Sequence, residues 1–214
     1  MRFREIQIVL LMMLFLQGCS NHSPEKSITA FWSWFSTEYA EVPPPFKPDT
    51  EDNESVKISK KLQAINTDLS CKLDAKAETK RALIISARGN KKLFPLVREV
   101  VADAPKMKYW KVIAFKPRVE KLEPVEIDGM MVSPEDIFFT AQPHDGVVDI
   151  SVLLDHTIPP ATAEKIAVLM LDQALGEYDA ATKIGKTTFA PITELNEDNS
   201  NFRELRKAVD DYCK

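Results

Sequence analysis

Apolar residues recur at helical spacing in some stretches of the chain and form short alternating or continuous runs in others. Helical spacing, which predicts a helix with one buried face, occurs over residues 28–39, 58–69, 90–104, 160–175 and 201–212. Alternating or continuously apolar runs predict strands at residues 69–73, 81–87, 110–115, 125–132, 137–154 and 187–192. Runs of strands with helices between them indicate an α+β fold: a single domain with a mostly antiparallel sheet and helices packed on it.

Turn residues refine three of these boundaries. Asp128-Gly129 predicts a type I′ hairpin, because both central residues of that turn need a positive φ. A second hairpin is expected around Pro143–Gly146, where Asp and Gly are typical turn residues. Gly176 is expected to end the fourth helix.

The chain is expected to have one linker and one separate C-terminal element. Prolines between Val42 and Pro48 exclude a helix there, and with the acidic residues that follow they predict a linker over residues 42–54. The α+β domain is therefore expected over residues 28–192. A C-terminal amphipathic helix follows within residues 193–214.

The N-terminus has the features of an exported protein. Arg2 and Arg4 precede an apolar run, Ile6–Leu16, which has the length of a signal-peptide core but is too short to span a bilayer as a helix. The next residues, Leu16-Gln17-Gly18-Cys19, resemble a bacterial lipobox. The resemblance implies that residues 1–18 are a signal peptide, that Cys19 is lipidated, and that residues 19–27 form a tether.

This resemblance also predicts where the protein is found. Ser20 follows the lipidated cysteine, and the aspartate that retains such proteins in the inner membrane is absent. We therefore expect a protein anchored to the membrane by its N-terminal lipid, in the outer membrane facing the periplasm. The alternative, if the leader is not used, is a cytoplasmic protein.

The state of two further cysteines, Cys71 and Cys213, depends on where the protein is found. The periplasm is oxidising, so a disulfide between them is possible, and it would close a long loop. It requires the C-terminal helix to dock over the strand that holds Cys71. The alternative is two unpaired cysteines.

Charge and composition exclude several classes of function. The chain has 28 Lys and Arg against 32 Asp and Glu, a net charge of -4, so nucleic acid is not an expected partner. Its six glycines form no dinucleotide-binding, P-loop or nucleophile-elbow motif. With three scattered histidines and no CxxC pair, neither a metal nor another cofactor is expected.

Two groups of charged residues are candidates for chemistry. The first group lies at the end of the fourth helix and consists of three carboxylates and a tyrosine: Asp172, Glu177, Tyr178 and Asp179. Its carboxylates suit acid–base catalysis or the binding of a hard cation. The alternative is a solvated loop. The second group is a basic stretch: Lys111, Lys116, Arg118 and Lys121. It could bind lipid phosphates or an acidic partner. The alternative is a solvated sheet edge, whose lysines prevent pairing with another strand.

Smaller candidates come from aromatic residues and histidines. Trp34 falls outside the apolar stripe of the first helix, so it is a possible member of a binding surface. His144-Asp145 and Asp155-His156 are His–Asp neighbours, for which turn or cap roles are the simpler explanation. The residues themselves identify no catalytic residue.

Several segments together resemble a family of uncharacterised bacterial proteins with the same order of segments. They are Ile28–Phe35, Leu83–Val97, Trp110–Arg118, Ser133–Phe139 and Leu171–Gly185. The resemblance implies a single domain and no particular activity.

The sequence favours a lipid-anchored cell-envelope protein that acts as a non-enzymatic binding or interaction module, with a protein or other envelope component as its partner. The first alternative is a carboxylate-based hydrolase or carbohydrate-active enzyme of the envelope. The second is a cytosolic type of domain that is exported. Two convergent carboxylates in a cleft would favour the enzyme.

Overall fold

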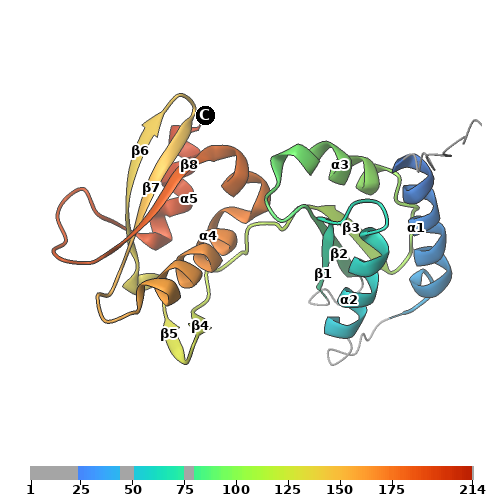
Figure 1. Cartoon of the computed structure of the whole chain (residues 1–214), viewed down its shortest axis with the longest axis horizontal. Coiled ribbons are helices and arrows are strands. Elements are labelled where there is room, and N and C mark those ends of the chain that lie inside the picture. The colour runs from blue at the N-terminus through green and yellow to red at the C-terminus, as the bar shows by residue number, and fades with distance from the viewer. Residues whose placement is uncertain (1–23, 44–50, 75–79, 214) are drawn as a thin grey trace, which may run out of the picture.

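The computed structural model describes residues 24–43, 51–74 and 80–213, and it is an α+β domain with mostly antiparallel strands. The expected fold class is confirmed. Its described strands are divided over three sheets, and its buried apolar side chains form two hydrophobic clusters. We call residues 24–118 the N-terminal lobe and residues 119–213 the C-terminal lobe. Figure 1 shows the two lobes side by side, with α4 lying toward the N-terminal lobe.

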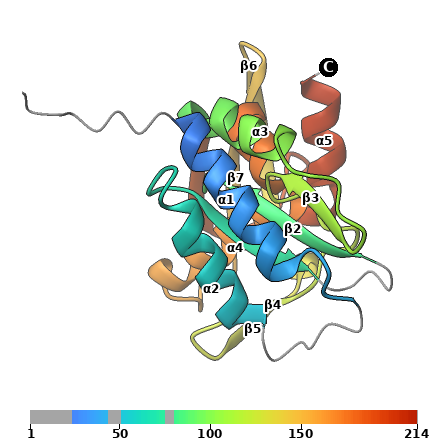
Figure 2. The same cartoon turned by 90° about the vertical axis from the view of Figure 1, so that its right-hand side faces the viewer.

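The N-terminal lobe is built on a three-stranded sheet of order β1-β2-β3, in which β1 is antiparallel and β3 parallel to β2. Its elements are α1 (Pro24–Tyr39), α2 (Glu51–Leu62), β1 (Ser70–Asp74), β2 (Arg81–Ser86), α3 (Phe94–Ala102) and β3 (Trp110–Ala114). The central position of β2 explains its continuously apolar sequence, because both faces of that strand are covered. Figure 2 shows α1 crossing in front of this sheet with α2 beside it.

The C-terminal lobe holds a hairpin and a four-stranded sheet of order β8-β7-β6-β9, in which β7 and β8 are parallel. Its elements are β4 (Val125–Ile127), β5 (Met130–Val132), β6 (Phe138–His144), β7 (Val147–Leu154), α4 (Pro160–Lys183), β8 (Ile184–Pro191), β9 (Ser200–Asn201) and α5 (Leu205–Tyr212). Short 3₁₀ turns lie at Lys91–Leu93, Pro134–Asp136 and Phe202–Glu204.

Both predicted hairpins are present. Asp128 and Gly129 have φ values of 53° and 77°, so the β4–β5 turn has the type I′ geometry that the sequence predicts. In the β6–β7 hairpin the turn is shorter than expected. Only Asp145 and Gly146 lie in it, whereas Pro143 and His144 belong to β6.

The aromatic helix α1 packs as predicted. Its stripe is buried, and the Nε1 of Trp32 donates a hydrogen bond to the carbonyl oxygen of Val100 at 2.8 Å. The Nε1 of Trp110 donates in the same way to Tyr39 at the end of the helix. The helix begins at Pro24, a favoured first position, so the last four residues of the expected tether are helical.

The expected linker over residues 42–54 is wrong at its C-terminal end. Helix α2 begins at Glu51, and acidic residues suit this position because the helix dipole favours negative charge at an N-terminus. The same helix ends at Leu62, earlier than its apolar spacing predicts. An Asx turn, in which Asn66 accepts a hydrogen bond from the Asp68 N–H, leads into β1.

Helix α4 continues where the sequence predicts an end. Gly176 has a φ of 67° and a ψ of 172°, so it breaks the helix, but the helix resumes and runs to Lys183. The residues after Gly176 are therefore on a second helical segment instead of in a loop.

The C-terminal helix α5 packs on the C-terminal lobe, against α4, β6 and β7. Cys213 therefore belongs to the C-terminal hydrophobic cluster, whereas Cys71 belongs to the N-terminal one. Both are free thiols in this structure, which therefore has the second of the two alternatives, unpaired Cys71 and Cys213: the C-terminal helix does not dock over β1.

Removing α1 should unfold the protein. Five of its side chains are buried, and each contributes about 1.5–3 kcal/mol of burial free energy, which together rivals the ~5–15 kcal/mol by which a whole domain is stable. We expect a chain that begins at Pro43 to lose its cooperative thermal unfolding transition in circular dichroism, whereas a chain that begins at Ser20 keeps it. Equal melting temperatures would show that α1 is not part of the core.

Candidate functional site

The acidic group of α4 lies where the two lobes meet. We call this contact zone the seam: residues 87–89 after β2, residues 116–118 after β3, and residues 172–179 of α4. The centre of the seam is Glu177, whose side chain is 3% exposed. Its Oε1 accepts hydrogen bonds from the backbone N–H groups of Ala87 at 2.8 Å and Gly89 at 3.0 Å.

The other carboxylate oxygen of Glu177 binds the second loop of the seam. Oε2 accepts from the N–H of Lys116 at 3.2 Å, and the N–H of Glu177 itself donates to the Lys116 carbonyl oxygen at 2.9 Å. One buried carboxylate is therefore satisfied by three backbone donors from the other side of the seam. Buried charge is tolerated only when it is satisfied in this way, so the role of Glu177 is structural.

Local backbone geometry prepares both sides of this contact. Arg88 and Gly89 have φ values of 52° and 79°, and this left-handed turn aims the N–H groups of Ala87 and Gly89 at one carboxylate oxygen, while the Arg88 N–H donates to the Ser86 Oγ. Opposite them, a Cβ on Gly176 would lie 2.7 Å from the Lys116 carbonyl oxygen and 2.8 Å from the Arg118 nitrogen. Only glycine fits there, in space and in conformation.

The remaining carboxylates of the acidic group pair with the basic stretch. Asp172 accepts from the Nζ of Lys116 at 2.9 Å, and Asp179 binds Arg118. Arg118 also forms a two-pronged ion pair with Asp210 of α5, at 2.6 and 2.7 Å. Hydrogen bonding between these partners holds the pKa of Arg118 above and that of Asp210 below the ordinary value. Two cations of the basic stretch thus pair with two carboxylates of the acidic group.

Tyr178 belongs to the seam as well. Its ring lies 5.5 Å from the ring of Phe94 and 5.4 Å from that of Phe115, centre to centre. The guanidinium of Arg98 lies 5.0 Å from the centre of the same ring. These contacts connect α4 to the N-terminal lobe, so the ring acts mainly in packing.

Trp34 is not part of this group. It is half-buried on α1, where its ring packs edge-on against Tyr39 and the Nζ of Lys61 on α2 lies 5.3 Å from the ring centre. Trp34 therefore contributes to the packing between α1 and α2.

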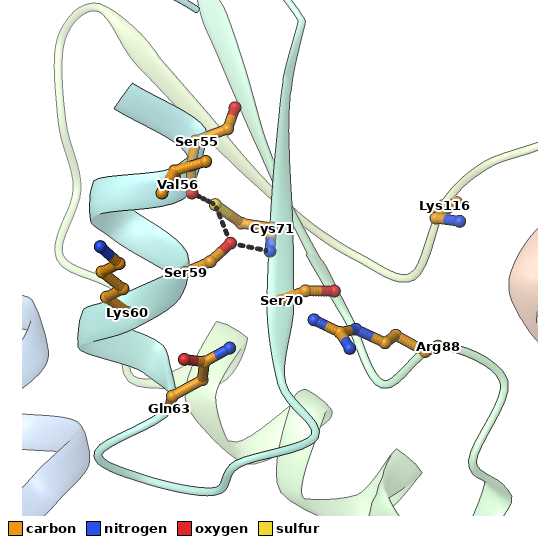
Figure 3. Close-up of a pocket in the computed structure, with 9 residues that line it drawn as sticks. All are labelled: Ser55, Val56, Ser59, Lys60, Gln63, Ser70, Cys71, Arg88 and Lys116. Atoms are coloured by element: carbon orange, nitrogen blue, oxygen red, sulfur yellow. Dashed lines mark hydrogen bonds between the residues drawn. The ribbon is translucent and has the colours of Figure 1, made fainter. Parts of the chain in front are cut away.

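A polar cavity lies beside the seam, between α2, β1 and the turn that holds Arg88. We call it the groove; its volume is about 520 Å³. Its described lining contains three cations, several hydroxyl and amide groups, and no carboxylate: Ser55, Val56, Ser59, Lys60, Gln63, Ser70, Cys71, Arg88 and Lys116. Figure 3 shows the guanidinium of Arg88 extending toward Ser70 on β1.

The groove could not be predicted from the sequence, because its residues come from separate parts of the chain. Ser55 and Ser59, spaced by four, lie on the same helix α2, and Ser55 precedes residues 58–69, over which a helix was expected. Arg88 is in a turn, and the turn brings it opposite that helix only because β2 and β1 are antiparallel neighbours. No spacing along the chain carries that information.

Cys71 lies in the wall of the groove and is held by serines. The Ser59 Oγ accepts the Cys71 N–H at 3.0 Å, and the Cys71 thiol donates to the Ser55 carbonyl oxygen at 3.4 Å (Figure 3). Burial raises the pKa of the Cys71 thiol to about 11, although the hydrogen bond with Ser59 lowers it. The thiol is thus protonated at neutral pH and is a poor nucleophile.

The histidine pairs give no catalytic group. Nε2 of His144 lies 3.0 Å from the Asp149 carboxylate, which raises the pKa of this exposed histidine. His156 stays 3.7 Å from Asp155. No group of three metal-binding side chains occurs among the described residues. Nor is any helix in the described part of the chain long and apolar enough to cross a membrane.

Comparisons with known proteins give no relative. No family model, no curated protein and no solved structure matches this chain.

The Gly176→Ala variant should be strongly destabilised. A non-glycine residue in this backbone conformation costs on the order of 1–3 kcal/mol in strain, and the added Cβ also collides with the backbone after β3. We expect a lower midpoint in urea unfolding. The control is Gly146→Ala, also at positive φ but with open space around its Cβ. An equal effect of the two substitutions would argue that the close contact is unimportant.

Proposed function

We propose that the chain is a lipid-anchored protein of the cell envelope, and that it binds an anionic ligand in the groove without catalysing a reaction. Cys19 and the leader lie outside the described residues, so the anchor is supported by the lipobox resemblance and the preceding apolar run. The groove is supported by its charge and its position on the folded domain.

One observation carries the proposed binding: among the described residues, three cations line the groove and no carboxylate does. Within the described residues Lys60 and Arg88 form no ion pair, so their charges are available to a ligand. Lys116 shares its charge with Asp172. Hydroxyl groups of Ser55 and Ser70 add donors for an oxygen-rich anion, such as a phosphate group.

The enzyme alternative is less well supported. It depends on a pair of convergent carboxylates, but each carboxylate of the α4 group already has a partner. Glu177 accepts backbone N–H groups, Asp172 pairs with Lys116, and Asp179 pairs with Arg118 and Lys183. In the groove itself, the thiol of Cys71 is protonated at neutral pH and no general base lines the wall.

Lipidation is tested on the protein from cells. The mature chain should begin at a Cys19 that carries acyl groups, as measured by mass spectrometry of the membrane fraction. A Cys19→Ala variant should keep its leader and lose the acyl mass. Recovery of a wild-type chain with an intact Met1 would contradict the anchor.

Anion binding is tested by calorimetric titration of the mature protein in detergent with inorganic phosphate. Glycerophosphoglycerol, the deacylated form of an anionic phospholipid, is titrated in parallel to distinguish free phosphate from a lipid headgroup. Charge reversal at Lys60 and Arg88 should weaken binding about five- to thirtyfold, since two exposed charge contacts contribute together about 1–2 kcal/mol. Affinity should also fall as salt rises.

The matched control reverses two exposed lysines away from the groove, Lys111 and Lys121. Both lie in the basic stretch, so the change in net charge is the same. If the control variant loses as much affinity as the groove variant, the attraction comes from overall charge. Absence of binding by the wild-type protein to either anion would reject the groove as an anion site.

A further inference from the structure

Two of the three cations of the groove are attached to backbone that Glu177 holds. Arg88 lies between Ala87 and Gly89, whose N–H groups both donate to Oε1 of Glu177. Lys116 donates its own N–H to Oε2. A single buried carboxylate from the C-terminal lobe thus fixes the main chain at both positions, although Glu177 does not line the groove.

From this arrangement we infer that Glu177 is the positioning residue of the groove: it sets the place of Arg88 and Lys116 and so couples ligand affinity to the contact between the lobes. The inference rests on the proposed anion binding. Arg88 is held in a left-handed conformation, which a non-glycine residue adopts at some cost. Without the Glu177 carboxylate, the turn loses the two hydrogen bonds that hold Arg88 in this conformation.

The third cation provides the internal comparison. Lys60 comes from α2, which has no hydrogen bond to Glu177, and the α2 wall is held instead by the Ser59–Cys71 contact. Loss of the Glu177 carboxylate should therefore affect the contribution of Arg88 to binding and leave that of Lys60 unchanged.

Coupling of this kind acts in both directions. If the contact between the lobes strengthens ligand binding, bound ligand must strengthen that contact by the same factor. The amides of Ala87, Gly89 and Lys116 report on this directly, because they are the donors to Glu177. We expect their hydrogen exchange to slow when phosphate binds.

The test is a pair of double-mutant cycles on the Kd for inorganic phosphate, measured on the mature protein in detergent. Glu177→Gln keeps the size of the side chain and replaces one acceptor oxygen by an amide, so it is preferred to Glu177→Ala, which leaves buried donors unpaired. We expect Glu177→Gln to weaken binding about tenfold, which is about 1.4 kcal/mol. Its effect should be non-additive with Arg88→Ala and additive with Lys60→Ala.

A loss of stability alone would not give this pattern. Val152→Ala, a buried substitution on β7, which contributes no residue to the seam, is the control, and it should lower the unfolding midpoint while leaving the phosphate Kd unchanged. If wild type binds phosphate and Glu177→Gln binds it equally well, or if both cycles are additive, the positioning role is wrong and the groove stands. If wild type does not bind, the groove assignment fails first, and this inference fails with it.

Discussion

The structure depends on a buried carboxylate that must be satisfied from outside its own helix. Each lobe has its own hydrophobic cluster, and the elements between them meet through polar and aromatic groups at the seam. Apolar contacts tolerate some sliding, but three N–H groups that converge on Glu177 do so in one arrangement only. The cost of burying an unsatisfied charge therefore fixes how α4 lies against the two loops of the N-terminal lobe.

Gly176 and Glu177 act together in this contact. The glycine breaks α4 and lets the helix approach the backbone after β3, and the next residue places its carboxylate among the donors. Around them, Asp172, Asp179 and Tyr178 find partners in the opposite lobe. A dense group of charges, which at first suggests chemistry, is here explained by the need to join two small lobes that share little apolar surface.

Much of the local structure was predictable from the sequence, because it depends on residues close together in the chain. The type I′ hairpin at Asp128-Gly129 and the buried stripe of α1 follow from spacing and turn chemistry. The prediction went wrong where a distant contact decides. Nothing local shows that the chain turns helical again after Gly176, or that α5 packs away from β1 and leaves Cys71 and Cys213 apart.

The same distinction separates the candidate sites. The acidic group and the basic stretch are visible in the sequence as runs of charge, yet folding pairs Asp172 with Lys116 and Asp179 with Arg118. The groove is assembled from four places in the chain, and two of its cations, Lys60 and Arg88, form no ion pair among the described residues. Charges that are paired within a protein stabilise its fold, whereas unpaired charges attract ligands. The groove is therefore the better candidate for function, and the seam holds the main chain at two of its cations.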